Sequence, residues 1–154
     1  MMLFQKKTKE EQSIAKKIRK KAKQSILKIT EKSNSTSWRV KADKLFMSQG
    51  QGKPCAVCKK TDGTVFHHII EKSRSRALRY DLMNVLPLCP LHHCNSNEIA
   101  PHATKRVAVT RWWTWLIANH PEKYVYCKKN EYSQSRFTYK EMFEKLNSEI
   151  EVMK

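Results

Sequence analysis

The sequence predicts a mostly helical α+β protein with a small β-hairpin in its middle. Three observations support this prediction. Apolar residues recur with helical spacing near both ends, two short apolar runs at 65–70 and 84–89 are typical of β-strands, and pairs of cysteine and histidine frame these runs. We expect an N-terminal basic helical arm over residues 1–35, a central domain over 36–130 and a C-terminal helix over 131–154.

The N-terminal arm is predicted to be an amphipathic helix over residues 6–34. Ile14, Ile18, Ala22 and Ile26 recur every four residues, and lysines fill the other faces. In one interpretation the isoleucine stripe packs on the body of the protein. In another, the lysine faces lie along a polyanion, and both can hold together.

Three further helices are expected. Residues 38–47 form a helix with Val40, Leu45 and Phe46 on its apolar side, and residues 110–119 form one that is apolar nearly all round, which favours a core position. Thr138 opens the last helix, and Glu141, three residues on, completes a capping box. The buried stripe of this last helix is expected to be Met142, Phe143, Leu146 and Ile150.

The charge of the chain indicates a polyanionic partner. Lysine and arginine number 31 against 14 acidic residues, which gives a net charge of +17. Nucleic acid is the commonest such partner. Only 3 glycines are present, which argues against a glycine-rich phosphate loop. We find neither a membrane-spanning run nor a secretory signal, and we expect a cytoplasmic protein without membrane contact.

Cysteine spacing predicts a structural zinc site. Cys55 and Cys58 form a CxxC turn, and Cys89 and His92 repeat the same spacing about 30 residues later. Two residues three apart on a tight turn can both point at one ion, so two turns supply four tetrahedral ligands. His93 and Cys94 also lie within reach of the second turn, and we prefer His92 because it repeats the two-residue gap.

The segment between the two zinc turns contains a double histidine, His67-His68, in a strand-like run. Adjacent residues on a strand point to opposite faces. One histidine can therefore face a metal ion while the other faces elsewhere. Residues 81–89 are expected to return as the second strand, and His93 is expected to open a helix.

These motifs resemble the HNH, or ββα-metal, endonuclease motif in its zinc-bearing form. The resemblance covers the CxxC turn, the double histidine, the Asn84-Val-Leu-Pro-Leu-Cys89 run and His92-His93. Within that superfamily the stretch 76–84 resembles phage recombination endonucleases of the lambda NinG (Rap) type, which cut branched DNA. It differs from them in having histidine at position 92 and in the residues after His93.

The resemblance implies a role for each matching residue. His68 takes the place of the general base that activates water, and Asn84 that of the residue that orients the base and braces the loop. His67 and His93 take the places of ligands to a catalytic Mg²⁺ or Mn²⁺ ion, and histidine ligands would also admit softer metals. His102 is either a further ligand, a phosphate contact or a surface residue.

The loop after the double histidine is strongly basic. Its cations are predicted to bind DNA phosphates, although some could instead pair with Asp81 or Glu71. The predicted DNA-binding residues are Lys72, Arg74, Arg76 and Arg79.

The leading hypothesis is a metal-dependent DNA endonuclease that acts on branched recombination intermediates in a phage context, hence in the bacterial host cytoplasm. One alternative is a packaging-associated or nicking phage HNH enzyme. Another, from a different class, is a zinc-ribbon DNA-binding module without catalysis. A role in resolving junctions would favour a homodimer.

Overall fold

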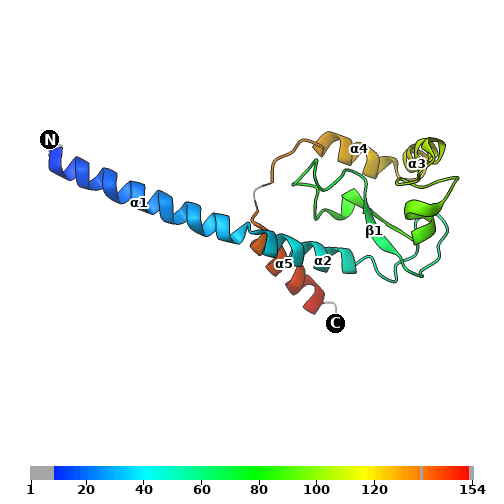
Figure 1. The fold of residues 1–154 in the computed structure, drawn as a ribbon, viewed down its shortest axis with the longest axis horizontal. Coiled ribbons are helices and arrows are strands. Elements are labelled where there is room, and N and C mark those ends of the chain that lie inside the picture. Colours follow the sequence, from blue (N-terminus) through cyan, green and yellow to red (C-terminus); the bar gives the residue numbers. More distant parts are fainter. Residues whose placement is uncertain (1–8, 136, 153–154) are drawn as a thin grey trace, which may run out of the picture.

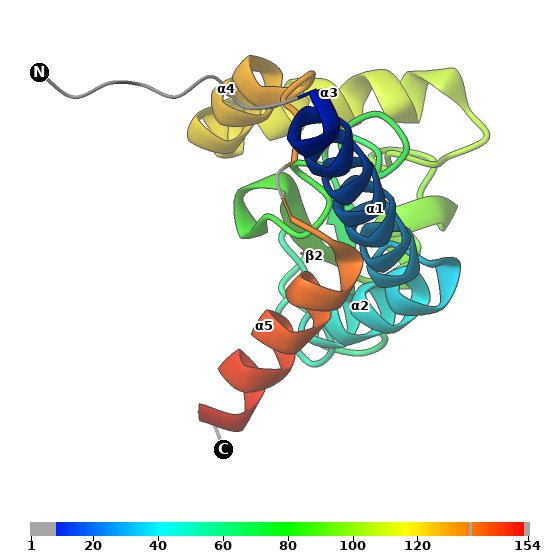
Figure 2. The same cartoon turned by 90° about the vertical axis from the view of Figure 1, so that its left-hand side faces the viewer.

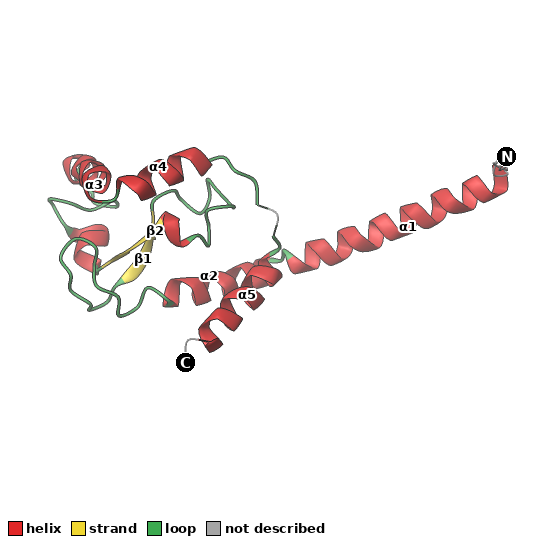
Figure 3. Cartoon of the chain, turned by 180° about the vertical axis from the view of Figure 1, so that it is seen from behind, coloured by secondary structure: helices red, strands yellow, loops and turns green. Residues whose placement is uncertain are grey.

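The computed structural model describes residues 9–135 and 137–152. It is mostly helical, with one two-stranded antiparallel sheet (Figures 1 and 3). The mixed α+β class predicted from the sequence is therefore confirmed at this level. The elements in chain order are α1 (Lys9–Ser33), α2 (Thr36–Ser48), β1 (Val65–His68), the single turn η1 (Leu82–Asn84), β2 (Val85–Leu88), the wide helical turn η2 (Leu91–Asn95), α3 (Arg106–Asn119), α4 (Pro121–Asn130) and α5 (Tyr139–Val152).

The hairpin of β1 and β2 lies between two pairs of helices (Figure 1). Val65 pairs with Leu88 and His68 with Val85, so side chains alternate between the two faces. One face joins an apolar core with α3 and α4 that contains Trp112 and Leu116. The other face packs on α2 and α5.

The last helix begins as the sequence predicts. The backbone N–H of Thr138 donates to the Glu141 carboxylate at 2.6 Å, and the N–H of Glu141 donates to the Thr138 hydroxyl at 3.2 Å. This reciprocal pair is the predicted capping box. Leu146 is buried, while Met142, Phe143 and Ile150 are half-buried, so the expected stripe faces α2.

Helix α1 corrects one expectation. It projects from the body as a free-standing rod (Figures 1 and 2), and Ile14, Ile18 and Ile26 are exposed. The isoleucine stripe therefore does not pack on the body, because the linker at Asn34 directs the helix away from it. The lysine faces are exposed as well.

Two further helical details differ from expectation. Helix α3 buries one face only, through Ala108, Trp112 and Leu116, because the hairpin lies along that side alone, and Trp113 stays 36% exposed. Of the apolar side expected for α2, Phe46 is buried and Leu45 is half-buried, whereas Val40 is exposed and Ala42 is buried in addition.

Candidate metal centres and adjoining cavity

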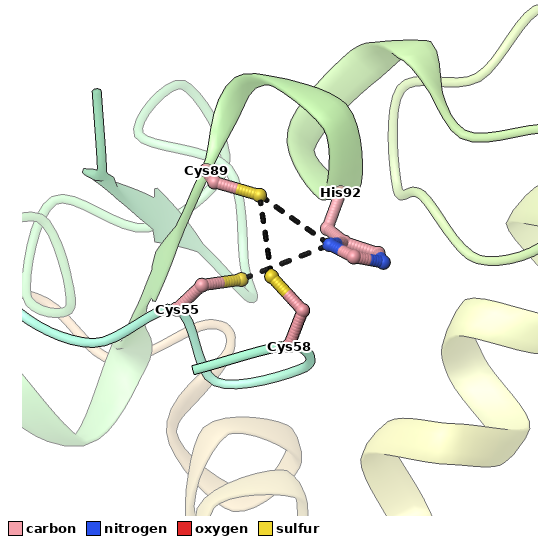
Figure 4. A group of neighbouring side chains, drawn as sticks. All are labelled: Cys55, Cys58, Cys89 and His92. Carbon is pink, nitrogen blue, oxygen red and sulfur yellow. Dashed lines mark hydrogen bonds between the residues drawn. The ribbon is translucent and has the colours of Figure 1, made fainter. Parts of the chain in front are cut away.

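The structure brings the two predicted zinc turns together. Cys55, Cys58, Cys89 and His92 form one cluster whose ligand atoms all lie within 4.8 Å of one another (Figure 4). The first turn precedes β1 and the second follows β2, so pairing of the strands places the two turns side by side. The cluster could hold a metal ion such as zinc.

The distances within this cluster fit tetrahedral zinc. Zn–S bonds of about 2.3 Å and Zn–N bonds of about 2.0 Å place two sulfurs about 3.8 Å apart and a sulfur and a nitrogen about 3.5 Å apart. The Cys58 and Cys89 sulfurs are 3.7 Å apart. His92 Nδ1 lies 3.4 Å from the Cys89 sulfur and 3.9 Å from the Cys55 sulfur. The residues present therefore match the donor set of a structural zinc site.

The first turn is shaped to direct sulfur toward the cluster. The N–H of Cys55 donates to the Lys60 carbonyl, and the N–H of Lys59 donates to the Cys55 carbonyl. Lys59 adopts the left-handed conformation, with φ of 66°, to close this turn. Burial of Cys55 opposes ionisation, but hydrogen bonds from backbone N–H groups, first that of Cys58, outweigh it and lower the pKa of this thiol, which favours the metal-binding thiolate.

A second cluster consists of histidines only. His67, His93 and His102 each offer one nitrogen, and these nitrogens lie within 4.8 Å of one another. The ring centroids are 5.0 to 5.3 Å apart. The backbone N–H of His102 donates to the backbone carbonyl of His93 at 3.2 Å, and this bond holds His102 beside the other two histidines. The sequence left His102 undecided between three roles, and its place here allows that of a ligand.

The electrostatics of this second cluster favour neutral imidazoles. Burial, and then the proximity of His102 and His93, holds the pKa of His67 well below its usual value. Burial, followed by His102, also lowers the pKa of His93. Neutral imidazoles have a lone pair free for a cation, so this cluster could hold a second metal ion. Its three ligands leave coordination positions open, unlike the four of the first cluster.

His68 is not a member of this cluster, and its ring lies against Phe46 of α2, with ring centroids 5.9 Å apart. Its Nε2 lies 2.8 Å from the Arg79 carbonyl, and because a carbonyl only accepts, Nε2 carries the proton and Nδ1 keeps its lone pair. Burial is the main cause that lowers the pKa of His68. The side chain is therefore neutral near pH 7 and able to accept a proton at Nδ1.

Asn84 braces the loop between the two strands and is fully buried. Its Oδ1 accepts from the Ile70 N–H at 2.8 Å, and its Nδ2 donates to the carbonyls of Ile70 and Leu78 at 2.9 and 3.0 Å. Leu78 directly precedes Arg79, whose carbonyl holds His68. Asn84 thus fixes the backbone that orients His68 without contacting its ring.

The predicted DNA-binding residues occupy different environments. Arg79 forms two hydrogen bonds with the Asp43 carboxylate, at 2.6 and 2.8 Å. Arg76 donates to the Phe137 carbonyl at 2.9 Å, and Arg74 pairs with Glu131 at 2.7 Å. The ion-pair partners of Arg79 and Arg74 are therefore Asp43 of α2 and Glu131, which directly follows α4, and not Asp81 or Glu71.

Lys72 lines a cavity of about 600 Å³ together with the histidine cluster and His68. His67, His68, His93 and His102 all contribute to its wall. Helix α2 contributes Arg39 and Asp43, which sequence reasoning missed. No local pattern marks them, since Asp43 lies 36 residues from its partner Arg79. The cavity therefore brings the three clustered histidines, His68 and several cations into one space.

Comparison with family models, curated proteins and solved structures finds no match for this chain. Among the helices of residues 9–135 and 137–152, none has the length and apolar character required to cross a membrane.

Proposed function

We propose that this protein is a metal-dependent DNA endonuclease of the HNH kind, hydrolysing phosphodiester bonds. One observation carries the proposal: the 600 Å³ cavity is lined both by the His67, His93 and His102 cluster and by His68 with its free Nδ1 lone pair. A cation next to a proton acceptor is the minimum that metal-assisted hydrolysis requires. The net charge of +17 supports DNA as the substrate.

Each residue has a distinct part in this reaction. His67, His93 and His102 would hold a divalent cation such as Mg²⁺ or Mn²⁺, which when bound supplies Lewis-acid stabilisation of the scissile phosphate. His68 accepts the proton of the attacking water at Nδ1, while Nε2 stays bonded to the Arg79 carbonyl. Lys72 at the cavity wall attracts the phosphate.

Asn84 and the cysteine cluster act indirectly. Asn84 holds the loop that carries Arg79, and so keeps the His68 ring in one orientation. Zinc bound by Cys55, Cys58, Cys89 and His92 would fix the ends of the hairpin, and so the spacing of His67 and His93.

A plasmid assay tests the proposal. Supercoiled plasmid and a four-way junction are incubated with the protein and Mg²⁺ or Mn²⁺, with and without a chelator. We expect metal-dependent cutting that His68→Ala lowers by roughly 10³-fold while DNA binding stays within about twofold. His120→Ala is the matched control, because this half-buried histidine lies outside the cavity and packs on Trp115.

The same assay separates the alternatives. Preference for the junction over the plasmid supports branched recombination DNA as the substrate. For such a substrate we propose action in the cytoplasm of a bacterial host and cutting by a homodimer. Equal nicking of both supports the packaging-associated or nicking role. Tight DNA binding without cutting in either Mg²⁺ or Mn²⁺ would reject the endonuclease hypothesis and favour a zinc-ribbon DNA-binding module.

A further inference from the structure

A second cavity, of about 320 Å³, borders the loop that follows β1. Its wall combines apolar residues at 69 and 70, aromatic rings from α3 and α4 (Trp113 and Tyr124), and cations from the loop and α4 (Arg74 and Lys128). None of these aromatic or α4 residues contributes to the metal-binding cavity. Glu71 alone lines both cavities, so they adjoin across that residue.

The two cations of this cavity are held by one carboxylate. Glu131 is only 2% exposed, and it accepts from Arg74 at 2.7 Å and from Lys128. Both cations remain about half exposed on their outer sides. Two cations here face two carboxylates, Glu131, which holds them, and Glu71, which lines the same wall. The exposed N–H groups of Arg74 and Lys128 can still donate to an anion, and Glu131 restrains the two long side chains in advance, which reduces the entropy lost when an anion binds. The arrangement suits a phosphate at the mouth of the cavity.

Trp113 supplies a second kind of contact. Its neighbours Trp112 and Trp115 stack on each other, with centroids 5.2 Å apart, and Trp112 is fully buried. Trp113 instead faces outward from α3, is 36% exposed and borders the cavity. A partly exposed indole next to a cationic mouth offers a flat surface for a base and a charge for its phosphate.

From this combination we propose that the cavity binds one unpaired nucleotide of single-stranded DNA, with the base against Trp113 and its phosphate at Arg74 and Lys128. The base must be unpaired, because the face of a base within a duplex is covered by its neighbours. The proposal rests on the proposed function in taking DNA as the substrate. Since the two cavities adjoin at Glu71, the unpaired nucleotide lies next to the position of cutting, which selects forked or branched DNA over a blunt duplex.

Fluorescence anisotropy with the full chain tests this. The probes are a labelled 12-nucleotide single strand and the blunt duplex of the same sequence, without added divalent cation and with DNA integrity checked on a gel. We expect Trp113→Ala to weaken single-strand binding at least about fivefold and duplex binding less than twofold. Trp113→Phe should retain most of the affinity, because it keeps an aromatic face.

Ile117→Ala is the matched control for loss of apolar surface. Ile117 is 45% exposed on the same helix and lies outside the cavity. It should bind both probes as the unaltered chain does, and the melting temperature and zinc content of all variants should agree. Arg74→Gln should weaken single-strand binding and reduce its salt dependence by about one ion.

Three outcomes would overturn the inference: unchanged single-strand binding by Trp113→Ala, an equal loss for both probes, or the same loss in Ile117→Ala. The plasmid assay gives a separate answer. A chain that binds the single strand through Trp113 but never cuts retains the nucleotide site and loses the endonuclease function. A chain that cuts DNA but whose single-strand binding is unchanged in Trp113→Ala retains the endonuclease function and loses the nucleotide site.

Discussion

The cysteine cluster and the histidine cluster differ, although one helical turn, η2, contributes a histidine to each. His92 completes the cysteine cluster, whereas the next residue, His93, belongs to the histidine cluster. The first cluster has four ligands, three of them sulfur, and its atoms sit at tetrahedral spacing. The second has three nitrogen ligands and borders a cavity. A closed set of soft ligands suits structural support, and an open set beside a cavity suits chemistry.

The largest effect should come from breaking the cysteine cluster. Cys55→Ser removes a buried ligand, and we expect the loss of about 3 kcal/mol or more in the free energy of unfolding, a fall in melting temperature of roughly 10 °C. Metal content per chain should fall with it. Cys94→Ser is the control, because Cys94 is exposed and outside the cluster. Unchanged zinc content in Cys55→Ser would contradict the assignment.

Breaking the histidine cluster should lower the cutting rate strongly and the stability only slightly. His67→Ala removes the buried ligand of that cluster, and we expect metal-dependent cutting to fall by roughly 10³-fold. The structural zinc should stay bound, and the melting temperature should change less than in Cys55→Ser. A plasmid-cutting assay and a metal analysis on the same preparation measure the cutting rate and the zinc content. Simultaneous loss of the structural zinc would show that the two clusters are not separable.

Asn84→Ala should lower both the stability and the cutting rate, each by less than the cluster variants do. The substitution leaves the buried Ile70 N–H and two carbonyls without their partner, which costs about 2–3 kcal/mol of stability. Cutting should also fall, because the loop that orients His68 loosens. Thermal melting and the cutting rate test this prediction. Full stability together with full activity would show that Asn84 braces nothing.

The smallest effect concerns Glu131, which pairs with the side chains of Arg74 and Lys128 and belongs to neither metal cluster. The hydrogen bonds from Lys128 and then Arg74 lower the pKa of Glu131 below its usual value of 4.5. A lowered folded-state pKa gives stability that is present above pH 4.5 and is lost as the pH falls through the folded value. Glu131→Gln should therefore melt below the unaltered chain at pH 7, and the difference should shrink as the pH falls below 4.5 through the folded-state pKa. A difference that stays constant over this acidic range would argue that the charge of Glu131 contributes nothing.

The features that follow from short-range geometry could be predicted from the sequence. The spacing of Cys55 and Cys58 sets the first metal turn, Thr138 and Glu141 form the capping box, and strand alternation separates His67 from His68. Each depends on residues at most three positions apart, where the backbone conformation alone fixes the relative placement of side chains.

Only the tertiary structure decided the remainder. It brought His102 to His93, paired Arg79 with Asp43 and Arg74 with Glu131, and left Trp113 and the isoleucines of α1 exposed. These outcomes depend on how four helices pack around one hairpin. The contacts of Arg79 with Asp43 and of Arg74 with Glu131, 36 and 57 positions apart, follow from that packing, and no spacing pattern in the sequence encodes them.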